Sequence, residues 1–193
     1  MEKFLEIIKL FGKVGSNIWL EESNIFSPKD DYDFIFEEIA KNNNIIKNTK
    51  LIYRASRDGD SYDNFFNKCN GINNIVLLIK SNNNSIFGGF TKVGFKKIKS
   101  TKFKDDLAFV FSFDKKKIYP IKKGKDAIRC CSCCCPQFCE NSIYLYKNFL
   151  SQNENFVNYK DENYEGFTID YELNNGTKNF TVIELEIHQI FFF

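Results

Sequence analysis

Several residue types are scarce in this sequence of 193 residues, which has one Trp, one His, one Met and three Pro. A single histidine leaves no room for a histidine-rich metal site, and it makes His188 the sole candidate for a histidine base. No run of 18 apolar residues occurs, so no transmembrane helix is expected. Glu2 and Glu6, with no small-residue cleavage site, argue against a secretory signal. We therefore expect a cytoplasmic, reducing compartment and no structural disulfides.

Phenylalanine and tyrosine are abundant by contrast, with 22 Phe and nine Tyr. Aromatic side chains fit the pleated, half-buried surface of a sheet, and the length suits one domain. Two helical patterns precede a series of hairpins. The expected fold class is therefore α+β, an antiparallel two-sheet β-sandwich covered by a few short helices. Residues 1–22 are expected to form an N-terminal amphipathic helix or extension, and residues 23–193 the domain itself.

Local patterns place the individual elements. Ser27 and Pro28 predict the start of a first helix, and Asp58-Gly59 predicts a turn after a strand at 51–56. Asp60 or Ser61 would cap a second helix that ends at Asn70-Gly71. The segments expected to be strands are 75–80 paired with 85–90, 107–113 paired with 118–121, then 143–145, 167–173 and 180–188.

Charge is unevenly distributed along the chain. Residues 92–125 hold twelve lysines and three acids, whereas residues from Glu154 onward hold eight acids and two lysines. Within the basic segment, the candidate interaction surface includes Lys96, Lys97, Lys99 and Lys102, which lie between two expected strands. They indicate either a surface for an acidic partner or membrane, or solvated loops and edge strands protected from aggregation. No element typical of a nucleic-acid reader accompanies them, so no nucleic-acid partner is expected.

The stretch "RCCSCCCPQFCE" contains six cysteines, namely Cys130, Cys131, Cys133, Cys134, Cys135 and Cys139. A structural zinc site usually draws cysteine pairs from two well-separated knuckles, and only one is present here. A C-x-x-C occurs without the βαβ setting of a redox motif. Redox sensing by exposed thiols beside Arg129 stays open. We favour the interpretation that small apolar residues are required in a tight strand and turn.

Few other residues suggest chemistry. Glu184 and Glu186 share one face of the last expected strand, as an acid–base pair, as a solvated stripe, or as partners of Arg54 and Arg57. His188 is expected at a surface or interface. Because no catalytic constellation or cofactor motif emerges, we expect neither an enzyme nor a cofactor. Two adjacent glycines, Gly88 and Gly89, lack the neighbours of a phosphate-binding loop and predict a bulge or a close backbone approach.

Four motifs, in order, resemble the TLDc domain family: "LIYRASRDGDSYDNFFNKC", "IFGGF", "LAFVFSF" and "FTVIELEIH". Arg54, Arg57, Asp58 and Gly59 belong to the first, and Glu186 to the last. Cys135 and Cys139 stand where the family has glycines.

The resemblance implies a non-enzymatic interaction domain linked to protection against oxidative stress. It also implies binding to the peripheral part of the vacuolar proton pump (V-ATPase), with membrane association only through the pump. The alternatives are a thiol-based redox protein and a scaffold whose partner is unrelated to the pump.

Overall fold

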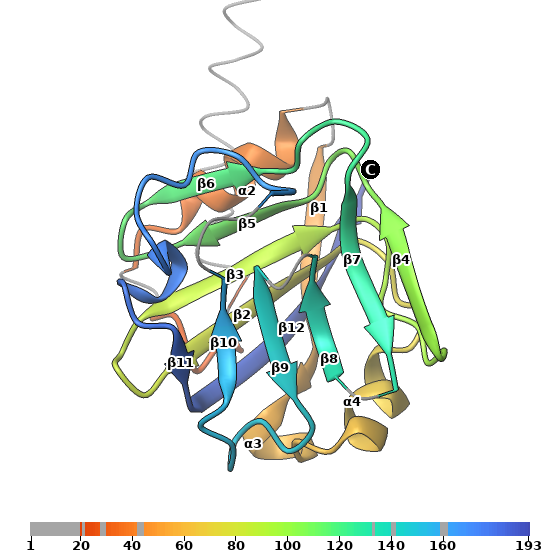
Figure 1. The fold of residues 1–193 in the computed structure, drawn as a ribbon. Helices are drawn as coiled ribbons and strands as arrows, with labels where there is room; N and C mark the ends of the chain where they lie inside the picture. The colour runs from red at the N-terminus through yellow and green to blue at the C-terminus, as the bar shows by residue number, and fades with distance from the viewer. Residues whose placement is uncertain are drawn as a thin grey trace, which may run out of the picture.

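The computed structural model describes residues 20, 22–27, 30–41, 45–132, 134–139, 142–158 and 162–193 (Figure 1). The helix expected within residues 1–22 lies almost entirely outside them. No helix among the described residues is long and apolar enough to span a bilayer.

Two six-stranded antiparallel sheets face one another, which confirms the expected β-sandwich (Figure 1). The first sheet contains, in spatial order, β1 (Ile46–Arg54), β12 (Val182–Phe192), β2 (Ile75–Ser81), β3 (Ile86–Thr91), β5 (Phe109–Ser112) and β6 (Lys117–Pro120). The second contains β11 (Asn179–Phe180), β10 (Asn155–Val157), β9 (Ile143–Tyr146), β8 (Cys134–Phe138), β7 (Asp126–Cys131) and β4 (Ser100–Lys104). β1 and β4 are therefore edge strands, and β12 is an interior strand.

The main core lies between the two sheets, where alternate residues of each strand point inward. Gly89 lies beneath the ring of Phe138 from the opposite sheet, and a Cβ on Gly89 would lie 2.6 Å from Cζ of that ring. A Cβ on Gly88 would lie 1.9 Å from the carbonyl oxygen of Leu77. The β2–β3 and β3–β5 registers run without a bulge. Of the two interpretations of Gly88-Gly89, close backbone approach is therefore the one confirmed.

A second hydrophobic cluster covers the outer face of the first sheet, where α2 (Asp33–Ala40) buries Ile35, Phe36 and Ile39. The helix does not start at Ser27 as predicted. The Ser27 backbone N–H instead donates to the Asp30 carboxylate at 2.6 Å. This contact closes a local turn, so the helix begins after it, and Ser27 caps no helix.

Two short helices, α3 (Ala55–Asp58) and α4 (Tyr62–Cys69), close one end of the sandwich (Figure 1). The Ser61 hydroxyl accepts from the Asn64 backbone N–H at 3.2 Å, which confirms the predicted cap. Gly71 has a φ of 72°, as expected of a residue that follows a helix. The predicted strand at 51–56 starts after the true beginning of β1 at Ile46 and extends two residues too far, because Ala55 and Ser56 already belong to α3.

Of the remaining predicted strands, some lie where expected and one does not form. The hairpins β2–β3 and β5–β6 and the strand β9 lie where expected. Residues 167–173 form no strand; they are irregular and enter a 3-10 turn, η1 (Glu172–Asn174), flanked by left-handed Tyr171. β4 and β7 were not predicted. In β4 only Phe103 packs against the core, so its sequence shows no alternation.

Candidate functional site

Three polar side chains project from the outer face of β12, on the side opposite its core residues. Their exposed fractions are 8% for Glu184, 0% for Glu186 and 1% for His188. Glu184 and Glu186 share a face as predicted, but they are buried and form no solvated stripe. The expectation that His188 lies at a surface is wrong, because its ring is enclosed beside Glu186. Burial of three such groups in one row requires that each has hydrogen-bond partners.

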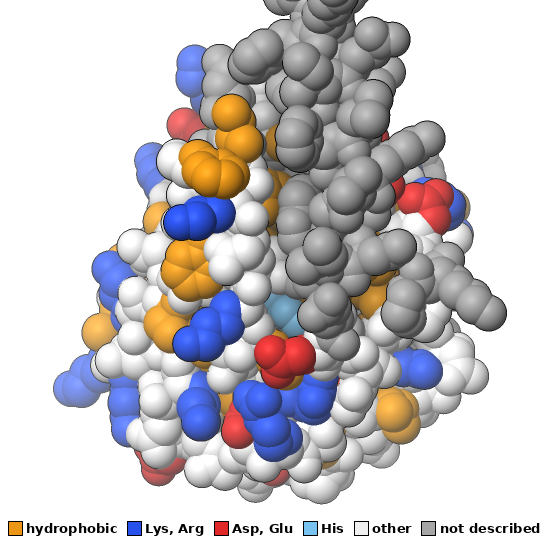
Figure 2. Space-filling model, turned by 180° about the vertical axis from the view of Figure 1, so that it is seen from behind, with side chains coloured by type: hydrophobic (Ala, Val, Ile, Leu, Met, Phe, Trp, Pro, Cys, Tyr) orange, Lys and Arg blue, Asp and Glu red, His pale blue; other side chains and the backbone are white. Residues whose placement is uncertain are grey.

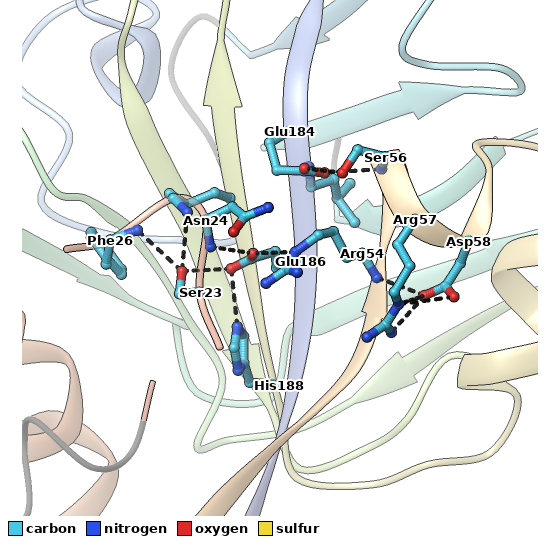
Figure 3. A network of polar contacts seen from close by, with 12 residues as sticks. Ser23, Asn24, Phe26, Arg54, Ser56, Arg57, Asp58, Glu184, Glu186 and His188 are labelled. Atoms are coloured by element: carbon cyan, nitrogen blue, oxygen red, sulfur yellow. Dashed lines mark hydrogen bonds and ion pairs between the residues drawn. The ribbon is translucent and has the colours of Figure 1, made fainter. Parts of the chain in front are cut away.

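Glu186 accepts hydrogen bonds from four donors (Figure 3). One carboxylate oxygen receives the Ser23 hydroxyl at 2.6 Å and contacts Nε2 of His188 at 3.1 Å. The other receives the Asn24 backbone N–H at 2.7 Å and Nε of Arg54 at 2.9 Å. A carboxylate has about four acceptor positions, so the Glu186 carboxylate is fully occupied.

The donors come from three stretches of chain, one of which is β12 itself. Arg54 lies directly opposite Glu186 in the β1–β12 ladder. Ser23 lies 163 residues away in sequence, and its hydroxyl also accepts from the N–H groups of Ile25 and Phe26 at 3.1 Å. Because Ile25 and Phe26 belong to the outer hydrophobic cluster, Glu186 anchors this N-terminal segment to the sheet.

The electrostatics of the cluster favour an ionised Glu186. Burial alone would raise the pKa of the Glu186 carboxyl, but hydrogen bonds from His188, Ser23 and the Asn24 N–H outweigh burial and lower this pKa. Nη2 of Arg54 is buried without a hydrogen-bond partner, so the guanidinium contributes only its Nε donor.

Serine, histidine and glutamate meet here, but not as a nucleophilic triad. In a triad the histidine lies between the hydroxyl and the carboxylate, so that it can accept the hydroxyl proton. Here the carboxylate lies between the other two, and Ser23 and His188 both contact the same oxygen of Glu186. A general base must also reach a substrate proton. The occupied carboxylate has no acceptor position left for one, so the arrangement suits anchoring.

Glu184, two residues before Glu186 on β12, has a comparable role (Figure 3). Its carboxylate accepts from the backbone N–H of Ser56 at 3.2 Å and from the Ser56 hydroxyl, at the start of α3. Asp58, at the end of α3, accepts from the Arg54 backbone N–H at 3.0 Å and pairs with Arg57 at 2.8 Å. The predicted Arg54–carboxylate pair therefore forms with Glu186, whereas Arg57 pairs with its own neighbour in sequence.

The four lysines predicted as an interaction surface are all exposed. We call Lys96, Lys97, Lys99 and Lys102 the basic edge, because they lie on β4 and the segment leading into it. Nζ of Lys97 pairs with Asp63 at 2.7 Å, and Nζ of Lys96 lies 4.9 Å from the ring centroid of Phe103. Lys102 lies opposite Arg129 in the β4–β7 ladder, which adds a further positive charge.

The cysteine run forms the end of β7 and the start of β8, as expected of small residues in a strand and turn. Cys133 lies outside the described residues, and Cys134 and Cys135 open β8. Neither Cys135 nor Cys139 has a positive φ, so the described backbone does not require glycine at these two positions.

The described thiols do not form an exposed reactive group. Cys130 and Cys139 are buried and are not disulfide-bonded. The Lys96 N–H donates to Sγ of Cys130 at 3.2 Å, but burial outweighs this contact and raises the pKa of the thiol. No group of three potential metal ligands occurs in the part of the chain that the structure describes.

One cysteine corrects an expectation. Cys131 is disulfide-bonded, contrary to the expected absence of disulfides. The expectation rested on the redox state of a compartment, which does not determine which sulfur atoms a fold brings within bonding distance.

The structure thus separates the predicted residues into distinct regions. Arg54, Arg57, Asp58, Gly59, Glu184 and Glu186 lie together around α3 and β12. Gly88 and Gly89 lie in the middle of β3, and the basic edge lies on the other sheet. The sequence interpretation missed Ser23, Asn24 and His188 as partners of Glu186. Two apolar residues, Ile25 and Phe26, lie shortly after Ser23 and pack in the outer hydrophobic cluster. The sequence does not indicate which carboxylate Ser23 binds.

Comparison with known protein families gives one match. The model of the TLDc domain matches residues 20–191. No curated protein matches the chain.

Proposed function

Because the chain belongs to the TLDc domain family, we propose that it is a non-enzymatic interaction domain. In this proposal it contributes to protection against oxidative stress and regulates the vacuolar proton pump by binding the pump's peripheral part. Family membership supports the proposal because proteins of this family are associated with these two roles. The occupied Glu186 carboxylate supports its non-enzymatic part, since a base without a free acceptor position cannot take a substrate proton.

The exposed lysines of the basic edge are the observation that supports the proposed interaction. Residues 64–104 contain no acidic residue, and all four lysines of the basic edge are exposed. β4 is also an edge strand, so one side of its backbone has no strand neighbour. An exposed edge rich in lysine resists self-association and attracts a partner of opposite charge. We therefore assign the partner an acidic contact surface, at the cytoplasmic face of endolysosomal or vacuolar membranes where the pump resides.

Charge reversal tests this surface. The four substitutions Lys96→Glu, Lys97→Glu, Lys99→Glu and Lys102→Glu should lower the association rate with the partner at least about tenfold at low salt. Raised salt should lower the association rate of the unmodified protein by a similar factor, because salt screens exposed charges. The matched control reverses four other lysines, namely Lys41, Lys115, Lys147 and Lys178, which are equally exposed. An unchanged association rate for the basic-edge variant would show that these lysines are only solvated.

Identification of the partner is a separate step. The protein immobilised on a resin should retain peripheral pump subunits from a cell lysate, and the basic-edge variant should retain fewer of them. If the resin instead retains proteins unrelated to the pump, and the basic-edge variant no longer retains them, the chain is a scaffold for another partner. That result would overturn the assignment to the pump.

A further inference from the structure

One corner of the molecule exposes large apolar side chains among lysines. Here the backbone N–H of Phe193 donates to the carbonyl of Ile45 at 3.1 Å, beyond the last paired residues of β1 and β12. The exposed fractions are 84% for Phe193, 53% for Ile45 and 37% for Phe191. Figure 2 shows hydrophobic and basic side chains interleaved along the side of the molecule where Figure 1 marks the C-terminus.

Three lysines lie in or beside this part of the sheet. Nζ of Lys47 lies 5.8 Å from the ring centroid of Phe193, and Nζ of Lys92 lies 5.7 Å from that of Phe192. Lys50 is exposed on β1, opposite Gln189. We call Ile45, Phe191, Phe193, Lys47, Lys50 and Lys92 the β1–β12 corner. It combines apolar side chains that protrude with ammonium groups beside them.

Acidic residues are absent from every stretch that builds the corner. Residues 39–57, 64–104 and 187–193 contain neither Asp nor Glu. Asp105 approaches from the next segment, but its carboxylate is buried and accepts from Oγ1 of Thr91 at 2.7 Å and the Lys92 N–H at 2.6 Å. The negative charge of Asp105 is therefore engaged inside the protein, and the corner presents positive charge outward.

We propose that the β1–β12 corner binds the anionic surface of a phospholipid membrane. Phenylalanine and aliphatic side chains insert at the boundary between headgroups and acyl chains, and neighbouring lysines contact anionic headgroups. The buried core of a protein interface is depleted of lysine and favours arginine, whereas here lysines lie directly beside the protruding apolar side chains and the β1–β12 corner has no arginine. The other strongly exposed isoleucines, Ile169 and Ile183, lie outside the corner.

This surface goes beyond the proposed function, since it uses different residues from the basic edge and a lipid in place of a protein. Each lysine near an anionic membrane raises affinity by about fivefold, so the three lysines and the apolar side chains would act together. Binding should accordingly need both anionic lipid and the apolar side chains, and it should weaken with salt.

Vesicle sedimentation tests the proposal. The full chain should sediment with vesicles of phosphatidylcholine and phosphatidylserine mixed at about three to one, and not with phosphatidylcholine alone. Two variants should each lower the bound fraction at least about tenfold. One carries Ile45→Ser, Phe191→Ser and Phe193→Ser, and the other carries Lys47→Gln, Lys50→Gln and Lys92→Gln. Circular dichroism checks that both variants remain folded.

Matched controls distinguish binding by the corner from nonspecific binding by exposed apolar side chains or lysines elsewhere on the surface. Ile169→Ser with Ile183→Ser removes two equally exposed apolar side chains, and Lys115→Gln, Lys147→Gln and Lys178→Gln removes three exposed lysines elsewhere. Both controls should bind vesicles as the unmodified protein does. No binding to anionic vesicles, equal binding to neutral ones, or equal loss in the controls would each overturn the proposal. Concentration-dependent dimers abolished by the apolar variant would instead assign the corner to a second copy of the chain. Because the basic edge is intact in both corner variants, partner capture reports on the proposed function separately.

Discussion

Glu186 illustrates how one residue can hold together distant parts of a chain. Its carboxylate receives Ser23 and Asn24 from the start of the domain, Arg54 from β1 and His188 from its own strand. A buried carboxylate with four donors is stabilising only while every donor has its partner, because each loss leaves a polar group unsatisfied in a medium of low polarity. The cluster therefore behaves as a unit.

Glu186→Gln should destabilise the domain by about 3 kcal/mol, because it removes the negative charge that Arg54 pairs with in a buried setting. Urea unfolding measures the change. Glu165→Gln, at an exposed position, is the control and should change stability little. Adding Arg54→Met to Glu186→Gln should cost less than the sum of the two single variants, since the orphaned charge is then absent. Additive losses would show that the two residues act independently.

Gly59 is constrained by its backbone conformation. It has a φ of 83°, and a Cβ there would lie 2.3 Å from Nδ2 of Asn64. Gly59→Val should therefore lower the free energy of unfolding by about 2 kcal/mol. Gly124→Val is the matched control, because Gly124 has a φ of 77° and no atom within 4 Å of the added Cβ. Gly59→Val should cost more than Gly124→Val, and an unchanged melting temperature for Gly59→Val would contradict the argument.

The two sheets meet at Gly89 of β3 and Phe138 of β8. The ring of Phe138 from β8 fills the space above Gly89, where any other residue would place a Cβ. The Phe138 ring also meets Phe95 edge-on, with centroids 6.0 Å apart. The separation of the sheets at this point depends on a large side chain facing a residue that has none.

Gly89→Ala should destabilise the domain by about 2 kcal/mol through overpacking, because its Cβ would lie 2.6 Å from Cζ of Phe138. Thermal unfolding measures the loss. The double variant Gly89→Ala with Phe138→Leu should recover part of it relative to the two single variants, since Leu is shorter. No recovery would place the clash on the backbone oxygen of Phe109, which would lie 2.9 Å from the same Cβ.

Strands with clear runs or alternation of buried apolar residues were predictable from the sequence, and others were not. β2 and β9 carry apolar residues in a clear pattern, and the Ser61 cap and the Gly71 stop follow from local chemistry. β4 has β7 as its hydrogen-bond partner, and all its residues except Phe103 are exposed. Residues 167–173 have strand-like composition, but Thr168 and Ile169 donate their N–H groups to Glu172, which bends the chain.

The carboxylate cluster was predictable only in part for a similar reason. The pairing of Arg54 with Glu186 follows from charge and from two expected strands. The contact between Ser23 and Glu186 joins residues 163 positions apart, and it depends on how the outer hydrophobic cluster folds over the sheet. Local sequence does not encode such a distance, so only the structure could reveal it.

Across the whole molecule, buried carboxylates couple stability to pH. Burial opposes ionisation of Glu172, but the N–H of Thr168, the ammonium of Lys117 and the N–H of Ile169 hold its pKa at about 2, below the ordinary 4.5. The pKa of Glu186 is lowered as well. A group whose pKa is lower in the folded state contributes stability above its unfolded value, and the contribution is lost as pH falls through the folded value.

The free energy of unfolding should therefore be constant near neutral pH and fall between about pH 4.5 and 2, with about 3 kcal/mol of the loss due to Glu172. Chemical unfolding across this range measures it. Glu172→Gln should be less stable at neutral pH and show a shallower acid loss, whereas Glu165→Gln should follow the unmodified curve. An equally steep acid loss in Glu172→Gln would assign the pH dependence to other carboxylates.

The place of β12 in the first sheet has a consequence for synthesis on the ribosome. β12 lies between β1 and β2, although some hundred residues separate it from both along the chain. Until β12 emerges, the edges of β1 and β2 that face it stay open and their apolar residues unburied, so the sheet cannot close before β12 has been translated. Such non-local pairing slows folding and leaves the nascent chain prone to aggregation. Chaperones that hold nascent chains would therefore be needed longest for the first half of this protein.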